Sequence, residues 1–171
     1  MQRFVLALAC IIVFIIFALQ KFAPQYTLPS ADDLLGNSTE ISTKAPEQAL
    51  AEIYFDVSIM GVEEATPQRL EDDFGIDPSI YYSCVGRYTD GRFGIADVIM
   101  LSPRPGCEDQ VREALQTIKL ARMNLFRNYD IYNAYQLAED GTIFQRGDYY
   151  ILTMIENDTA VRKIIETYIP R

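Results

Sequence analysis

A single long run of apolar side chains covers residues 4–19, with Arg3 directly before it and Lys21 shortly after it. As a helix this run rises about 24 Å, and the long basic side chains at both ends extend its reach toward the roughly 30 Å of a bilayer core. The sequence therefore predicts a membrane-spanning helix within residues 1–23. Because the α-amino group and Arg3 both precede the run, the positive-inside rule predicts a cytoplasmic N-terminus and an extracytoplasmic remainder.

Two other interpretations of this segment stay open. A cleaved secretory signal has a similar charge and apolar core, but its cleavage site needs two small side chains. Ala18 and Ala23 are preceded, two residues earlier, by Ile16 and Lys21, which are too large. A lipoprotein signal ending at Cys10 would have a short apolar run before the cysteine, and the residues after Cys10 stay apolar. The uncleaved anchor fits the pattern better than either alternative.

Beyond the anchor the hydrophobic periodicity is lost and then returns. Residues 24–46 are rich in Pro, Ser, Thr and Asp, a composition typical of a flexible tether. Periodic apolar positions resume near residue 47, and the remaining length suits one compact domain. We therefore expect an anchor over residues 1–23, a tether over 24–46 and one extracytoplasmic domain over 47–171.

Apolar positions spaced three and four residues apart predict the helices of this domain. We expect helices at about residues 46–57, 67–74, 106–127, 132–138 and 159–168. The second begins after the N-cap candidate Thr66 and ends at Gly75, which suits a helix C-terminus.

Alternating residues rich in β-formers predict two hairpins. The first pairs residues 80–88 with 92–101 about Asp90-Gly91, and the second pairs 142–145 with 149–155 about Gly147. Hairpins interleaved with helices indicate an α+β domain of two layers, an antiparallel or mixed sheet of two hairpins with helices packed on one face.

Charge and composition exclude several function classes. The net charge is −9, and the chain contains no His and no Trp. An acidic chain lacks the basic field that holds nucleic acid, and a chain without His lacks Ser–His and Cys–His catalytic pairs and most zinc and copper sites. The acidic residues between 63 and 77 lack the order of a calcium-binding loop, so we expect no metal and no cofactor.

Several short motifs occur in a characteristic order along the domain. They are FGID at residues 74–77, ADVI at 96–99, a helix ending at Arg122, YDIYN at 129–133 and QRGDY at 145–149. Together they resemble the family known as domain of unknown function 4358, over roughly residues 50–169. The resemblance implies a cell-envelope protein, because the family consists mostly of lipoproteins or membrane-anchored proteins of Gram-positive bacteria. It implies no activity, and the lack of a convincing lipobox separates this chain from the lipoprotein members.

Asp97 and Arg122 are the most informative charges. Asp97 falls on the face of its strand that carries large apolar residues, Arg122 borders the apolar stripe of the long helix, and the resemblance also places an acidic and a basic residue here. One interpretation is a polar handle for a ligand. The favoured one is a partly buried structural ion pair between helix and sheet, in which each charge is retained because the other is present.

Two cysteines and two tyrosines complete the candidate residues. Cys84 and Cys107 lie outside the anchor, and an oxidising compartment would let them form a disulfide; the alternative is that both are small buried thiols. The pairs Tyr81-Tyr82 and Tyr149-Tyr150 each place one ring on either face of a strand. If exposed, Tyr81 and Tyr149 are candidates for a binding surface; the favoured alternative is that these tyrosines simply pack on the sheet.

The sequence contains no recognisable catalytic constellation. We expect a membrane-anchored, extracytoplasmic module that binds an envelope protein or glycan, or that assembles with one, without catalysis of its own. The alternative is a carboxylate-based envelope hydrolase, which would need two acidic side chains facing each other across a cleft.

Overall fold

The structure is a computed structural model that describes residues 45–171; the expected anchor and most of the expected tether lie outside the described residues. The centre of the domain is a five-stranded antiparallel sheet in the order β1-β2-β3-β5-β4. Its strands are β1 (Val62–Glu64), β2 (Tyr81–Thr89), β3 (Asp97–Pro103), β4 (Thr142–Arg146) and β5 (Tyr149–Met154). Among residues 45–171, no helix combines the length and the apolar character needed to cross a bilayer.

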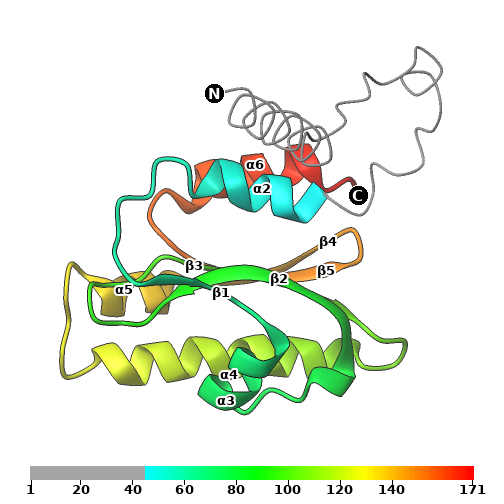
Figure 1. Cartoon of the computed structure of the whole chain (residues 1–171), viewed down its shortest axis with the longest axis horizontal. Helices are drawn as coiled ribbons and strands as arrows, with labels where there is room; N and C mark the ends of the chain where they lie inside the picture. Colours follow the sequence, from blue (N-terminus) through cyan, green and yellow to red (C-terminus); the bar gives the residue numbers. More distant parts are fainter. Residues whose placement is uncertain (1–44) are drawn as a thin grey trace, which may run out of the picture. The chain divides into compact units, whose positions relative to one another are not determined.

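Helices cover both faces of this sheet (Figure 1). The helices are α2 (Ala45–Ile53), α3 (Pro67–Phe74), α4 (Glu108–Phe126), α5 (Ala134–Asp140) and α6 (Asp158–Tyr168), with a short 3-10 helix η1 (Pro78–Ile80) before β2. Helices α3, α4 and α5 pack on one face, and α2 and α6 pack together on the other. The α+β class and the antiparallel sheet are confirmed, but the expected placement of all helices on one face is wrong.

The sheet is covered on both faces, which makes three layers, because β3 and β5 carry apolar side chains on both faces. Ile99 and Leu101 of β3 belong to the core beneath α4, whereas Val98 and Met100 belong to the core beneath α2 and α6. A strand that is apolar on both faces must be covered on both faces, because either face left in water would lose the free energy of burial. From the sequence, the alternation of residue types in 92–101 indicated only one covered face. In the structure, β5 also contributes to the core beneath α2 and α6, through Ile151.

Local signals predicted most element boundaries well. Helix α3 begins after Thr66, whose hydroxyl accepts a hydrogen bond from the Arg69 amide at 3.3 Å, and it ends at Gly75 with a φ of 70°. The second hairpin and the last helix also lie where the pattern placed them. Strand β1 and η1 were not predicted, since three residues are too few to show a period.

The connection between β2 and β3 is longer than expected. The two strands pair antiparallel as predicted, but β3 begins at Asp97 rather than near Arg92, so residues 90–96 form a loop. The Asp90 carboxylate accepts the Arg92 amide at 2.9 Å, and Gly94 has a φ of 110°, a conformation that leaves the strand. The Asp90 amide donates to the Gly61 carbonyl at 2.9 Å, which joins this loop to the segment before β1.

Candidate functional site

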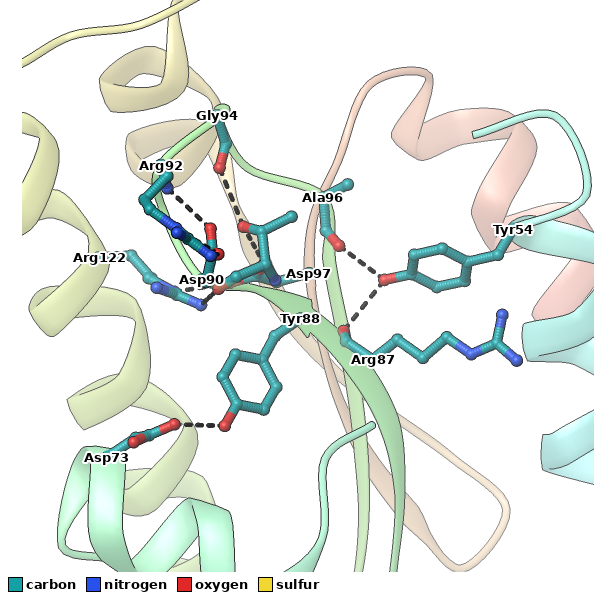
Figure 2. A network of polar contacts seen from close by, with 11 residues as sticks. Tyr54, Asp73, Arg87, Tyr88, Asp90, Arg92, Gly94, Ala96, Asp97 and Arg122 are labelled. Carbon is teal, nitrogen blue, oxygen red and sulfur yellow. Dashed lines mark hydrogen bonds and ion pairs between the residues drawn. The ribbon is translucent and has the colours of Figure 1, made fainter. Parts of the chain in front are cut away.

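A buried ion pair lies where β2 and β3 meet α4. Asp97 is the first residue of β3, and Arg122 lies in the last turns of α4. The Arg122 Nε is 2.7 Å from the Asp97 Oδ2, and both side chains are almost completely buried. The sequence indicated this pairing, and the structure brings the two charges together (Figure 2).

Thr89, the last residue of β2, completes the pair. Its amide donates to the Asp97 Oδ1 at 2.8 Å, its hydroxyl oxygen lies 3.2 Å from the same atom, and its carbonyl accepts from the Arg122 guanidinium. Burial raises the pKa of the Asp97 carboxyl, while Arg122 and the hydrogen bonds from Thr89 act in the opposite direction. Both carboxylate oxygens are therefore engaged within the protein, as expected of a structural pair rather than of a ligand handle.

Two aromatic rings surround the guanidinium. The Arg122 guanidinium carbon is 5.3 Å from the ring centroids of Phe74 and of Tyr88, and these two rings meet edge to face. Where water is excluded, cation–π contacts of this kind stabilise the guanidinium in addition to its ion pair with Asp97. Tyr88 also donates to the Asp73 carboxylate, which ties α3 to the sheet.

The loop formed by residues 90–96 is held from both faces of the sheet. On the α4 side, the Thr89 hydroxyl donates to the Gly94 carbonyl at 2.9 Å. On the α2 side, the Tyr54 hydroxyl lies 2.7 Å from the Ala96 carbonyl and 3.0 Å from the Arg87 carbonyl. Figure 2 shows Tyr54 and Arg122 reaching the strands from opposite sides. The loop is thus fixed to the fold at both of its ends.

Exposed apolar side chains gather around this loop. We name them the apolar rim; its members are Met60, Phe93, Leu125, Tyr129 and Tyr132. They come from three segments: the chain between α2 and β1, the β2–β3 loop, and the last turn of α4 with the region that joins it to α5. Figure 1 shows these three connections at the same end of the sheet. Tyr132 is 79% exposed and Met60 is 64% exposed.

Close approaches at two glycines show that the three segments touch. A Cβ at Gly94 would lie 3.3 Å from the Ile59 side chain and 3.9 Å from that of Tyr132. A Cβ at Gly91 would lie 2.7 Å from a methyl carbon of Leu125. The β2–β3 loop therefore lies against both other segments, so the exposed apolar side chains of all three occur at the same end of the sheet.

The backbone of the rim is also unusual. Tyr132 and Asn133 have φ values of 52° and 59°, in the left-handed region that large side chains rarely adopt. Such conformations persist only where surrounding contacts enforce them, and they concentrate at functional surfaces. Asparagine adopts this region readily, so the unusual residue is Tyr132, whose side chain is exposed.

A second surface feature is a groove along β1 and β2, which we name the β1–β2 groove. It consists of two adjoining hollows of about 330 and 280 Å³ that share Glu64 and Arg87. The first is bordered by Tyr54 and Val62, and the second by Leu50 of α2. The groove is open to solvent and mixes carboxylates, one guanidinium and apolar side chains.

Comparison with known proteins shows which family the chain belongs to. A family model described as "Domain of unknown function (DUF4358)" matches residues 56–155, more than half of the chain. The chain belongs to this family. The resemblance derived from the sequence motifs is therefore confirmed, and the matched DUF4358 region contains all five strands together with the Asp97–Arg122 pair. No curated protein and no solved structure shows significant similarity to the chain.

The remaining candidate residues of this DUF4358 domain take different positions from those expected. Tyr81 is only 3% exposed, so its expected role in a binding surface is wrong, and Tyr82 is the exposed member of that pair. A register shift between Tyr81 and Ser83 changes which residues face the core. Tyr149 is half-buried against the core beneath α2 and α6.

The two cysteines are free thiols, so the disulfide considered for Cys84 and Cys107 is not formed in the structure. The Cys84 thiol donates to the Ala65 carbonyl at 3.0 Å. Burial raises the pKa of this thiol to about 12. It is therefore an unreactive group at neutral pH.

Sequence reasoning missed the residues that hold and form the rim. Thr89, Tyr54 and Met60 gave no signal, because their roles depend on contacts with distant parts of the chain. The glycines at 91 and 94 were the available indication, since their φ values of 83° and 110° suit a loop and are readily adopted only by glycine. Among residues 45–171, no group of three or more Asp, Glu or Cys side chains is placed to hold a metal ion.

Proposed function

We propose that this protein is a membrane-anchored, extracytoplasmic binding or assembly module of the cell envelope, and that it recognises a protein partner through the apolar rim. The observation that carries the proposal is the rim itself. It brings exposed apolar side chains from three separate segments to one end of the sheet, on a base fixed by the Asp97–Arg122 pair.

The chemistry of the rim favours a protein partner. Tyr, Phe and Met are enriched at protein interfaces, because the aromatic rings bury a large apolar area with few rotatable bonds and the flexible methionine adapts to the partner's shape. Exposed apolar side chains scattered singly need no explanation, whereas a group at one end of the sheet, drawn from three neighbouring segments, favours an interaction surface. The rigid base supports the same reading, since a preordered surface loses less conformational entropy on binding.

The location rests on the apolar segment at residues 4–19. Its flanking charges support a cytoplasmic N-terminus and a domain outside the cytoplasm. Membership of the DUF4358 family is compatible with that location and adds no activity of its own.

The test is photo-crosslinking in cells that produce the full chain. A photoreactive amino acid replaces Tyr132, and the matched control places it at Leu120, which is also exposed but lies on α4 outside the rim. We expect a discrete protein adduct from position 132 and none from position 120. The double variant Met60→Ser, Phe93→Ser should abolish that adduct while the protein stays folded. Equal labelling from both positions, or adducts with glycan or lipid alone, would contradict a protein-binding rim.

The alternative is a carboxylate-based envelope hydrolase, and one observation favours it. Glu47 and Glu64 both border the second hollow of the β1–β2 groove, and acid–base glycoside hydrolysis uses two such carboxyl groups. Incubating the purified full chain with peptidoglycan distinguishes the two functions. Release of soluble saccharide that disappears in the Glu64→Gln variant would establish the hydrolase and refute a purely binding role.

A further inference from the structure

The outer edge of β2 is only partly paired. Strand β2 runs from Tyr81 to Thr89, but its neighbour β1 pairs with Arg87, Tyr88 and Thr89 alone. One further bond follows, from the Ala65 amide to the Gly86 carbonyl at 2.9 Å. The half of β2 that lies away from the apolar rim is paired with β3 on its inner side, but on its outer side it has no neighbouring strand within residues 45–171.

The ladder stops for two local reasons. Thr66 caps α3, so the chain turns out of the sheet directly after Ala65. The Cys84 thiol then takes the Ala65 carbonyl as its acceptor, a group that would otherwise accept an amide from β2. On the outer side, strand pairing ends at Gly86, whereas the pairing of β2 with β3 continues to Tyr81.

Backbone groups along an antiparallel strand point alternately to its two sides, and this shows which amides and carbonyls of β2 face the open edge. Gly86 turns its carbonyl toward β1, and residues two apart on a strand direct their backbone groups to the same side. The amide and carbonyl of Cys84 therefore point outward from the sheet edge. Within residues 45–171, Cys84 has no register partner in β1 and no main-chain hydrogen bond to the segment that follows β1.

This edge borders the second hollow of the β1–β2 groove. The hollow of about 280 Å³ is bounded by Cys84, Val85 and Gly86 on the strand and by Leu50 on α2. An extended chain placed in line with β1 would pass beside this hollow. One side chain of such a segment could then enter it, next to Leu50 and Val85.

Charge complementarity indicates the chemistry of that segment. Glu47 and Glu64 border the same hollow, and neither takes part in an ion pair within residues 45–171. The guanidinium of Arg87, also at this border, lies over the Tyr54 ring at 5.3 Å from its centroid. The chain as a whole carries a net charge of −9, which attracts basic partners.

We propose that the open edge of β2 accepts an extended segment of a partner protein as an added strand in line with β1. The segment presents an apolar side chain to Leu50 and Val85 and a basic side chain to Glu47 and Glu64. Main-chain hydrogen bonds to Cys84 supply the affinity, and the groove supplies the selectivity. The irregularity between Tyr81 and Ser83 limits the added strand to a few residues.

The three cysteines of the chain provide a direct test. The full chain, labelled with ¹⁵N only at cysteine, gives amide signals from Cys10, Cys84 and Cys107 in detergent micelles. The probe is a synthetic nonapeptide of alternating threonine and valine with a central lysine. On titration, the Cys84 amide should shift and become protected from hydrogen exchange. The Cys107 amide already donates to the Arg104 carbonyl at 2.9 Å and should not change.

Two modified probes and a matched pair of variants test the two parts of the proposal. N-methylation of alternate peptide amides should weaken binding about tenfold, because it removes the main-chain donors. Glu64→Gln should weaken binding about two- to fivefold at low salt, whereas Glu113→Gln, at an exposed position of α4, should leave it unchanged. A peptide with glutamate in place of lysine should bind more weakly than the parent peptide.

Three results would overturn the inference. The first is an unchanged Cys84 amide at millimolar peptide, and the second is equal affinity for the methylated and the parent peptides. The third is concentration-dependent protection of the Cys84 amide without peptide, which would identify a second copy of this chain as the occupant. None of these results depends on the apolar rim, so the edge site and the proposed function can fail separately.

Discussion

Removing one charge from the Asp97–Arg122 pair should destabilise the domain more than removing both. Asp97→Leu leaves the Arg122 guanidinium buried with only the Thr89 carbonyl and two aromatic rings as partners. Losing one partner of a fully buried pair costs about 3–5 kcal/mol, because the remaining charge is no longer compensated. The Arg122 and Asp97 side chains are 6% and 0% exposed, so solvent screening gives little relief.

The double variant Asp97→Leu, Arg122→Met removes both charges together. It keeps the apolar volume but leaves the Thr89 amide without the acceptor that now lies at 2.8 Å. An unsatisfied buried donor costs about 1–3 kcal/mol, so the double variant should be about 2 kcal/mol more stable than Asp97→Leu alone. For a domain of this size, 1 kcal/mol corresponds to about 4 °C in Tm.

The assay is urea and thermal unfolding of the full chain, followed by far-UV circular dichroism. Asp97→Leu should lower Tm by about 12–20 °C, and the double variant should recover roughly half of that loss. The matched control is Asp109→Asn, which breaks the exposed pair with Arg112 and should change stability by less than about 1 kcal/mol. If the double variant is as unstable as Asp97→Leu, the two charges do not depend on each other and the argument fails.

Three further predictions concern single residues. The Cys84 thiol, with its pKa raised to about 12, should react with iodoacetamide about a hundredfold more slowly in the folded chain than in urea at pH 8, as measured by mass spectrometry. Gly86→Ala should destabilise the domain by about 1–3 kcal/mol in urea unfolding, because the added Cβ would lie 2.7 Å from the Val98 carbonyl oxygen. Hydrogen bonds from Ser79 lower the pKa of Asp77 from its ordinary value of 3.8. The ionised Asp77 carboxylate therefore stabilises the folded chain fully above pH 3.8, and this contribution is lost as the pH falls through the lower pKa of the folded state. Asp77→Asn should therefore lose less stability than the parent chain between about pH 6 and pH 2.5 in urea titrations.

A specific result would contradict each of these three predictions. Equal alkylation rates in folded and unfolded chain would mean that Cys84 is not shielded by burial. A neutral Gly86→Ala variant would show that β2 and β3 are less closely packed than the structure has them. If the Asp77→Asn variant loses as much unfolding free energy in acid as the parent chain does, the Asp77 carboxylate does not contribute to the pH dependence of stability.

Elements with strong local signals could be predicted from the sequence. Helix α3 is marked at both ends, by Thr66 and by Gly75, and both residues act as their chemistry predicts. The hairpin of β4 and β5 has its glycine at the turn, with a φ of 53°. These features arise from the conformational preferences of a few neighbouring residues, so they need no knowledge of the rest of the chain.

Elements that depend on distant partners could not be predicted. Strand β1 is a strand only because it pairs with the end of β2, and a three-residue segment carries no periodicity of its own. The alternation of residues 92–96 resembles a strand, but the backbone of Gly94 and the bonds of Asp90 turn them into a loop. Sequence alternation could not decide which of Tyr81 and Tyr82 faces the core, because one irregularity in register reverses the side chains beyond it.

The sequence by itself determined the helical and strand segments with clear periodicity, the acidic character of the chain, the lack of histidine chemistry and the candidate pairing of Asp97 with Arg122. Only the tertiary structure decided that helices cover both faces of the sheet and that exposed apolar side chains from three segments share one surface. It also decided that β2 has an open edge. The physical reason is range: dihedral preferences and side-chain periods act over a few residues, whereas burial and strand pairing join residues far apart along the chain.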